Sequence, residues 1–197
     1  MQLKCIIIYL IDVSSKKVIR ITADGGNMER LVKKAQKGDA EAFIALIEES
    51  KETLKRVALS YLKNEEDAAD AIQETILNAY EHLGELKKAA FFRTWLVRIL
   101  INNCTKLYRK KKDHENYAYT PEEIISGNRQ EEFSVAFVSN LEFLDLLKAL
   151  SEENRTIFQL YFGEQFTISE IAEILQINEN TVKSRIRRGK EQLRKEL

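Results

Sequence analysis

The sequence predicts an all-α protein of two helical domains joined by a flexible linker, and three observations support this fold class. Apolar residues make up 44% of the 197 positions and charged residues 31%, a balance typical of a folded chain with a strongly charged surface. One proline and seven glycines supply too few turn residues for an all-β fold. Apolar residues also recur at spacings of three and four over two long stretches, which is the period of packed helices.

The first stretch, residues 28–112, predicts a domain of three or four packed helices. Leu54, Val57 and Ala58 illustrate the apolar period within it. Asn64 is the expected N-cap of one helix, because an Asn side chain can accept a hydrogen bond from the first turn. The three acids that follow Asn64 lie where the helix dipole favours negative charge.

Residues 113–138 differ in character and predict the linker. They contain the only proline, Pro121, a turn signal at Ser126-Gly127-Asn128, and an excess of acidic residues.

The helical period resumes in residues 139–197, which predict the second domain. Its strongest local signal is a capping box formed by Thr167 and Glu170. The helix that starts there breaks near Gln176, and Asn178 is the expected N-cap of the next helix. Two short helices joined by about three residues predict a helix-turn-helix.

The zero net charge hides a sorting of charge along the chain. Residues 64–86 carry seven acidic residues without a lysine or arginine, whereas residues 106–112 carry five cations without an acid. A single run of this kind is usually a solvated face. A second basic cluster, Lys183–Lys190, lies on the last predicted helix and favours a function for both clusters.

That last helix is predicted to bury Val182 and Ile186, which turns hydroxyl and cationic side chains outward. They are Thr181, Lys183, Ser184, Arg185, Arg187 and Arg188. An α-helix fits the major groove of DNA, where arginine can bind guanine through two hydrogen bonds and lysine can bind phosphates. The alternative is an amphipathic helix whose cations complement the dipole, but these cations start too early in the helix for that explanation alone.

Three stretches together resemble a known family. Residues 66–80 (EDAADAIQETILNAY), 92–99 (FRTWLVRI) and 181–188 (TVKSRIRR) are similar to signatures of bacterial sigma factors of the extracytoplasmic-function (ECF) type, in the sigma-70 family. The likeness covers about residues 29–197. It implies a protein that binds core RNA polymerase, recognises the minus-10 and minus-35 promoter elements, and starts transcription of a stress or envelope regulon.

The resemblance also implies site residues. The acidic helix would dock on the clamp helices of the largest polymerase subunit through Asp67, Asp70, Gln73 and Glu74. The minus-10 element would be held by Asn102, Asn103, Lys106, Arg109 and Lys110. The outward face of the last helix would read the minus-35 element, with the polymerase flap as a further partner. For Trp95 we expect core packing rather than stacking on a base.

Four positions depart from the family pattern: Lys106 stands where aspartate is common, Ser151 where proline is usual, Gln176 where glycine is frequent, and Gly189 where alanine is usual. Lys106 bears on which minus-10 sequence is preferred. Because glycine is about 1 kcal/mol less favourable than alanine inside a helix, we expect Gly189 to let the last helix fray.

The sequence also leads to expectations about partners, location and bound groups. The resemblance implies an anti-sigma factor as a partner. We expect a cytoplasmic protein without direct membrane insertion, since the longest apolar run is Cys5–Ile11. The two cysteines are far apart and no His cluster is present, so no cofactor and no metal are expected.

Catalysis is not expected either, because nucleotide-binding, GxSxG and HExxH motifs are absent and His82 and His114 stand alone. The alternative function is a helix-turn-helix regulator of the response-regulator type, attached to an unrelated helical sensor, which would not bind core polymerase.

Residues 1–27 lie outside the resemblance, as an extension before a second methionine, Met28. The codons for Gly25-Gly26-Asn27-Met28 read GGN-GGN-AAY-ATG and can contain GGAGG, as a bacterial ribosome-binding site would. We therefore favour Met28 as the start. The rival interpretation is a β-hairpin within residues 6–22, which is marginal in water unless it packs on something.

Overall fold

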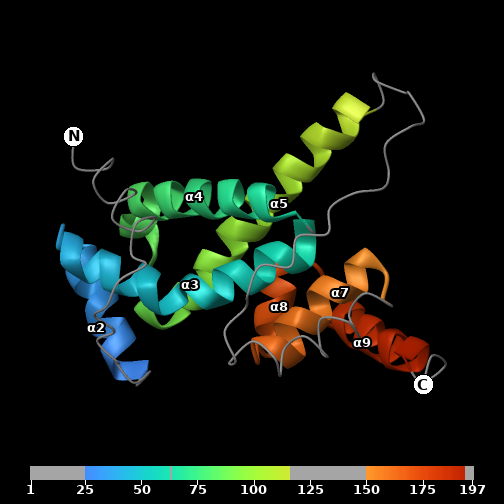
Figure 1. Ribbon diagram of the computed structural model, residues 1–197. Helices are drawn as coiled ribbons and strands as arrows, with labels where there is room; N and C mark the ends of the chain where they lie inside the picture. The colour runs from blue at the N-terminus through green and yellow to red at the C-terminus, as the bar shows by residue number, and fades with distance from the viewer. Residues whose placement is uncertain (1–24, 63, 116–149, 194–197) are drawn as a thin grey trace, which may run out of the picture.

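The computed structural model describes residues 25–62, 64–115 and 150–193, and these ranges are helical, without a strand (Figure 1). The predicted all-α class is confirmed. The elements are α2 (Gly25–Ala35), α3 (Ala40–Leu62), α4 (Glu65–His82), η1 (Leu83–Glu85), η2 (Ala89–Phe91), α5 (Phe92–Glu115), α7 (Glu152–Phe158), η4 (Gln159–Gly163), α8 (Ile168–Leu175) and α9 (Glu179–Leu193).

Helices α2 to α5 form the first body, in which α3 contacts α2, α4 and α5. Phe43 and Leu46 of α3 and Leu96 and Leu100 of α5 are among its fully buried side chains. Burial of each such side chain stabilises the fold by about 1.5–3 kcal/mol. Trp95 is half-buried with its ring centroid 6.0 Å from that of Phe92, as expected for core packing.

Two local features of this body concern α4 and α5. Asn64 caps α4 as predicted, because its side chain accepts a hydrogen bond of 2.9 Å from the Asp67 amide. Helix α5 continues to Glu115, beyond the expected domain end at residue 112.

Cys104 of α5 is fully buried, and burial raises the pKa of its thiol to about 12. This cysteine is therefore a packing residue rather than a nucleophile.

Helices α7, α8 and α9 form the second body and contain the predicted helix-turn-helix. The capping box of Thr167 and Glu170 opens α8, and Gln176 ends it in the left-handed conformation with φ of 54°. Asn178 directly precedes α9 and caps it, since its side-chain oxygen accepts a hydrogen bond of 2.8 Å from the Asn180 amide. Each of these features follows from a local sequence signal.

Gly189 behaves differently from the expectation of a frayed helix. It is buried, and a Cβ atom at this position would lie 2.4 Å from the Phe158 ring. The expectation was wrong because it considered only helix propensity. Glycine is required here by the close approach of α9 to α7, which alanine would prevent without a shift of the ring.

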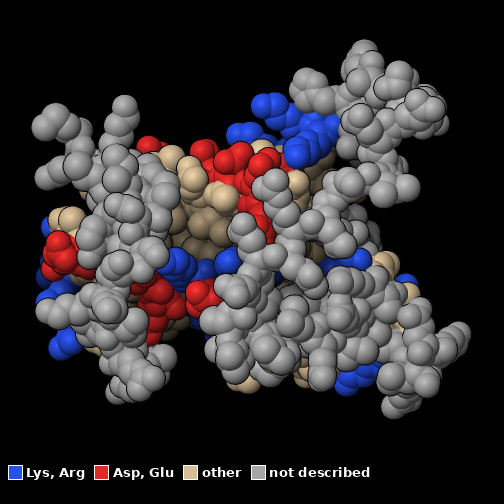
Figure 2. Space-filling view, viewed as in Figure 1, with Lys and Arg blue, Asp and Glu red and all other residues tan. Residues whose placement is uncertain are grey.

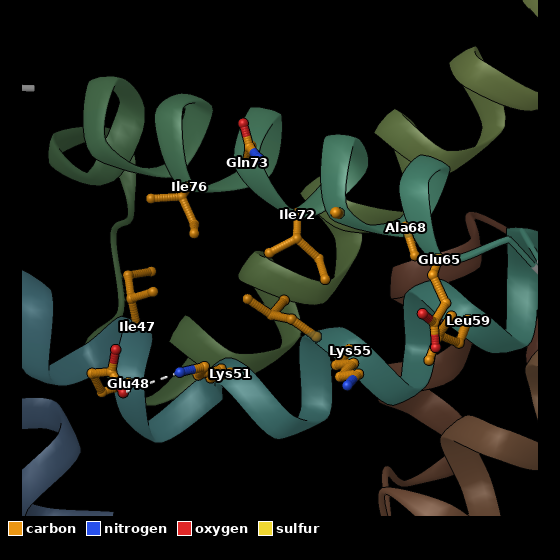
Figure 3. Close-up of a pocket in the computed structure, with 12 residues that line it drawn as sticks. Ile47, Glu48, Lys51, Lys55, Leu59, Glu65, Ala68, Ile72, Gln73 and Ile76 are labelled. Carbon is orange, nitrogen blue, oxygen red and sulfur yellow. Dashed lines mark ion pairs between the residues drawn. The ribbon is translucent and has the colours of Figure 1, made fainter. Parts of the chain in front are cut away.

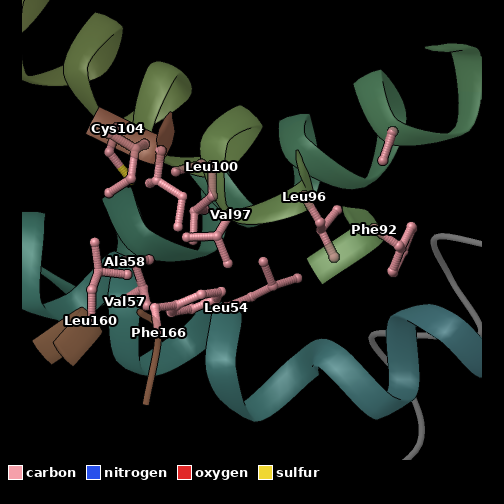
Figure 4. Packing of buried hydrophobic residues seen from close by; sticks show 14 of the residues in the cluster. Leu54, Val57, Ala58, Phe92, Leu96, Val97, Leu100, Cys104, Leu160 and Phe166 are labelled. Atoms are coloured by element: carbon pink, nitrogen blue, oxygen red, sulfur yellow. The ribbon is translucent and has the colours of Figure 1, made fainter. Parts of the chain in front are cut away.

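The two bodies pack against each other through a shared apolar cluster (Figure 4). Leu160 and Phe166 of the second body lie beside Leu54, Val57 and Ala58 of α3 in this view. All five are at most 2% exposed. The sequence predicted the two bodies but not this contact between them.

Some predictions fall outside the described residues. These are the two interpretations of the segment before Met28, as far as they concern residues 1–24, and the linker from residue 116 to 138. Met28 itself lies in α2 and packs against the core. Among the helices described, none combines the length and the apolar character needed to cross a bilayer.

Candidate nucleic-acid interface

Helix α4 presents an acidic face to solvent. Its buried side consists of Ala68, Ala71, Thr75 and Ala79. The opposite side exposes Asp70, Gln73 and Glu74, and within the described residues neither acid has an ion-pair partner. In Figure 2 the acidic side chains gather over α4 and basic ones over the far end of α5.

Asp67 differs from the other three residues predicted on this face. Its side chain is 15% exposed and accepts a hydrogen bond of 2.6 Å from the Lys111 Nζ atom of α5. The pair ties the start of α4 to the basic end of α5. The structure therefore gives Asp67 a role in joining two helices, whereas Asp70 and Glu74 form no ion pair with another described residue.

An apolar groove of about 340 Å³ runs beside the acidic face, between α3 and α4 (Figure 3). Ile47, Ile72 and Ile76 form part of its floor. Its rim carries a Lys51–Glu48 ion pair of 3.8 Å on α3 and Gln73 on α4. Sequence reasoning missed this groove. The groove forms only where α3 packs beside α4, and the apolar period of a helix does not show which helix packs beside it.

Helix α5 brings most of the predicted minus-10 residues to one exposed region. Asn102, Lys106, Arg109 and Lys110 are exposed, on a helix whose other side is buried against α3 and α4. A polar side chain followed by cations along a helix provides groups that can bind bases and backbone phosphates of a single strand.

Asn103 is 9% exposed and lies apart from that surface. Its Nδ2 atom donates a hydrogen bond of 3.1 Å to Thr75 Oγ1, and its Oδ1 atom accepts one of 3.4 Å from Asn78 Nδ2. Both partners belong to α4, so Asn103 joins α5 to α4. Its contact with DNA stays a prediction.

Tyr108 is a candidate that sequence reasoning missed. Its side chain is 39% exposed and lies in the sequence between Lys106 and Arg109. An aromatic residue interleaved with cations is typical of surfaces on which bases stack. That interleaving was the available signal.

The second DNA-binding candidate is α9, which buries Val182 and Ile186 as predicted. Lys183, Arg187 and Arg188 are exposed, whereas Thr181, Ser184 and Arg185 are half-buried. The predicted residues therefore lie along one helix.

The contacts described for Lys183, Arg187 and Arg188 are local to α9. Lys183 Nζ lies 3.8 Å from Glu179, and an Arg187 nitrogen lies 3.9 Å from Glu191. Arg188 donates a hydrogen bond of 3.3 Å to Ser184 Oγ. Exposed pairs of this kind contribute about 0–1 kcal/mol, so these cations can turn to phosphates or bases at little cost.

Comparison with known proteins finds two family models that match separate parts of the chain. The family model "Sigma-70 region 2" matches residues 46–114, and "Sigma-70, region 4" matches residues 140–193. Over 181 residues the chain is 31% identical to the ECF RNA polymerase sigma factor SigW of Bacillus subtilis (strain 168), covering 86% of this chain and 96% of SigW.

Two solved structures share the fold. CnrH, in complex with the cytosolic domain of CnrY, gives a TM-score of 0.62 at 23% identity and covers 85% of this chain and 94% of its own. The sigma factor RpoE of Bartonella quintana, in complex with the anti-sigma factor NepR, gives 0.61 at 20% identity and covers 79% and 96%.

A helical region 2 followed by a helix-turn-helix region 4 defines a protein of the sigma-70 family. Within that family the chain belongs to the ECF group and is an RNA polymerase sigma factor. Sigma factors are non-catalytic transcription initiation factors, in agreement with the expectation that this chain is not an enzyme. Because the chain belongs to the sigma-70 family, the alternative of a response-regulator type of transcription regulator is excluded.

Proposed function

We propose that this sigma factor docks on core RNA polymerase through α4, holds the minus-10 element with α5 and reads the minus-35 element with α9. In this proposal it acts in the cytoplasm and starts transcription of a stress or envelope regulon. The support is the separation of three chemically different exposed surfaces on three helices. Each surface suits one ligand: a basic protein, a single strand, and a duplex.

Polymerase binding rests on Asp70, Gln73 and Glu74 together with the adjoining groove. An acidic face suits a basic partner, and a groove beside it provides space for an apolar side chain of the same partner. We assign both to the clamp helices of the largest polymerase subunit. Gln73 belongs to both surfaces, which makes them continuous.

DNA binding is divided between α5 and α9. Along α5, Asn102 and the cations at Lys106, Arg109 and Lys110 would bind the unpaired non-template strand, with Tyr108 as a stacking surface. Along α9, the arginines would contact base edges of the minus-35 duplex and Lys183 its phosphates. The polymerase flap would support region 4 on that duplex.

Regulation is proposed through an anti-sigma factor. RpoE of Bartonella quintana is seen with the anti-sigma factor NepR, and that chain shares this fold. An inhibitor of this kind would cover the polymerase-binding and promoter-binding surfaces.

The single observation that carries the proposal is a pair of exposed acids, Asp70 and Glu74, beside an apolar groove and without an ion-pair partner in the described part of the chain. In a protein that bound only DNA, such an acidic face would lower the affinity, because DNA phosphates repel it. Run-off transcription with purified core polymerase on a promoter library tests the proposal. We expect transcripts that share two upstream elements, and DNA binding without any promoter-specific transcript would overturn it.

The groove is tested by filling it. Ala69 is exposed and lines the groove. Ala69→Phe should therefore fill the groove without disturbing the hydrophobic interior of the protein. We expect it to weaken binding to core polymerase about tenfold or more. Glu81→Phe places the same ring on the same helix outside the groove lining and serves as the matched control. Equal affinity of both variants for core polymerase would remove the groove from the interface.

A further inference from the structure

The first turn of α9 contains an asparagine that is not among the predicted minus-35 residues. Helix α9 begins at Glu179, and Asn180 is its second residue. The Asn180 side chain is exposed and forms no hydrogen bond with another described residue. Its backbone N–H belongs to the cap, since it donates to Asn178 Oδ1. An amide side chain is therefore available at the start of the helix that we assign to the major groove.

The nearest polar side chains make contacts within the protein. Asn178 Oδ1 caps the helix through its hydrogen bond of 2.8 Å. Glu179 forms an ion pair of 3.8 Å along α9. The Ser184 hydroxyl donates a hydrogen bond of 2.9 Å to the Thr181 carbonyl. Asn180 differs from these residues because neither its amide oxygen nor its amide nitrogen has a described contact.

Asn180 also lies on the side of α9 that is directed away from the rest of the second body. Successive residues of an α-helix are rotated by about 100° around its axis. Asn180 is therefore rotated by about 160° from the buried Val182 and by about 180° from the buried Gly189. Ser184 and Arg187 lie within about 40° of it. Asn180 is thus the first residue of the outward face of α9.

The position and the chemistry of this side chain favour direct reading of a base. In helix-turn-helix proteins, residues at the start of the second helix contact base edges in the major groove. An asparagine amide binds adenine through two hydrogen bonds, because its oxygen accepts from N6 and its nitrogen donates to N7. Guanine presents two acceptors there, and thymine an acceptor beside a methyl group. An exposed asparagine at this place therefore selects adenine.

The distance to Arg188 sets the separation of the bases that the two residues read. Arg188 follows Asn180 by eight residues, which is about 12 Å along the helix at about 1.5 Å per residue. Successive base pairs lie about 3.4 Å apart. A helix lying along the groove therefore places the two side chains about three to four base pairs apart. Arginine binds guanine through two hydrogen bonds, so the second base is a guanine.

From these observations we infer that Asn180 is a specificity-determining residue that reads an adenine of the minus-35 element through both atoms of its amide. This adenine lies about three to four base pairs from the guanine contacted by Arg188. The inference rests on the proposed function of α9 and adds a base and the residue that selects it. Lys183 binds phosphates and supplies affinity for any sequence, whereas Asn180 supplies selectivity.

The first test exchanges the amide for a carboxylate. The full chain, with core polymerase, transcribes a library of promoters in which the minus-35 element is randomised and each transcript carries a barcode. The wild-type chain should prefer adenine at one position by about 5- to 150-fold. Asn180→Asp cannot donate to N7, but its carboxylate accepts from cytosine N4, so the preferred base at that position should change to cytosine. Asn180→Gln retains the amide and should retain adenine.

Controls on α9 separate reading from a structural role. Glu179→Gln changes the adjacent residue, which is rotated by about 100° from Asn180, and should keep the adenine preference. Arg188→Ala should lose the guanine preference and keep the adenine preference, which locates the two positions. Asn180→Asp should stay folded, because the helix dipole favours an acid in the first turn, and melting temperatures verify this. Base preferences of Asn180→Asp equal to those of the wild type would overturn the inference.

The second test removes single groups from the DNA and needs no polymerase. A minus-35 duplex carries, at the adenine position, either 7-deazaadenine, which lacks N7, or purine, which lacks the N6 amino group. Each should weaken binding of the wild-type chain about fivefold, as expected for the loss of one hydrogen bond. Asn180→Ala should bind the unmodified and the two modified duplexes with equal affinity. Equal losses for both chains would show that Asn180 does not contact this base.

The outcomes distinguish the inference from the proposed function. If the wild-type chain starts no promoter-specific transcription with core polymerase, the proposed function fails, while selection of duplexes by the chain alone still decides whether Asn180 reads adenine. A wild-type chain that selects no duplex would overturn both. If transcription depends on the minus-35 element but no position responds to Asn180→Asp, the proposed function stands and the inference fails.

Discussion

The two helices assigned to DNA, α5 and α9, differ in how their polar groups are held. On α9 the described partners of Lys183 and Arg188 lie within the same helix, in the Lys183–Glu179 and Arg188–Ser184 contacts. On α5 the polar groups reach another helix, as in the Lys111–Asp67 and Asn103–Thr75 contacts. The cations described on α9 are thus held locally, whereas polar groups beside the exposed surface of α5 take part in the tertiary fold.

This difference has a consequence for mutations. A change on the exposed face of α9 alters what is bound and leaves the stability of the fold nearly unchanged, because surface substitutions typically stay within about 0.5 kcal/mol. A change on α5 or α4 can affect binding, stability or both. The four predictions below use matched pairs of residues to separate these outcomes.

The largest effect is expected from charge reversal on the acidic face. Asp70→Lys combined with Glu74→Lys should weaken binding to core polymerase by about 100-fold or more, because like charges facing each other cost several kcal/mol. Binding of minus-35 duplex by the same chain should not change. Fluorescence anisotropy titrations measure both affinities.

The control for that variant is Glu81→Lys combined with Glu85→Lys, which makes the same charge change at the other end of the acidic segment. It should leave core binding nearly unchanged. Equal loss of both activities in the first variant would mean unfolding, and full retention of core binding would remove α4 from the interface.

The second prediction separates two adjacent asparagines on α5. Asn103→Ala should lower the free energy of unfolding by about 1–3 kcal/mol, because it deprives buried polar groups of their partners. Asn102→Ala should leave the melting temperature unchanged and weaken binding of a non-template minus-10 oligonucleotide. Thermal unfolding and oligonucleotide titration measure the two quantities. If Asn103→Ala kept its stability but no longer bound the oligonucleotide, Asn103 would be a base contact, as the family resemblance implies.

The third prediction concerns the close approach of α9 to α7. Gly189→Ala should destabilise the chain by about 1–3 kcal/mol, because overpacking against Phe158 outweighs the gain of about 1 kcal/mol in helix propensity. Gly84→Ala is the matched control, since a Cβ atom at Gly84 meets nothing within 4 Å. Melting temperatures compare the two. A more stable Gly189→Ala chain would show that propensity dominates at this position.

The most specific effect is expected on α9, because it is confined to one base position. Arg188→Ala should cost about 1–3 kcal/mol at one base position of the minus-35 element, as expected for a contact with a base edge. Lys183→Ala should weaken all sequences alike and reduce the slope of log affinity against log salt by about one. Titrations over a panel of duplexes at several salt concentrations measure both. Identical behaviour of the two variants would refute the division into base and phosphate contacts.

The sequence by itself determined the features that depend on neighbours along the chain. The cap at Asn64, the capping box at Thr167 and the break at Gln176 were predictable because each is a backbone requirement satisfied within a few residues. The buried positions Val182 and Ile186 followed from the helical period, and with them the outward face of α9.

Only the tertiary structure decided the features that join distant segments. The burial of Asn103 depends on Thr75 of another helix, the requirement for Gly189 depends on Phe158, and the Arg56–Glu164 pair joins residues 108 positions apart. Apolar spacing shows which side of a helix is buried but not which helix covers it. The helices and their polar faces were therefore predictable, whereas the groove, the contact between the regions and the Arg56–Glu164 pair were set by packing.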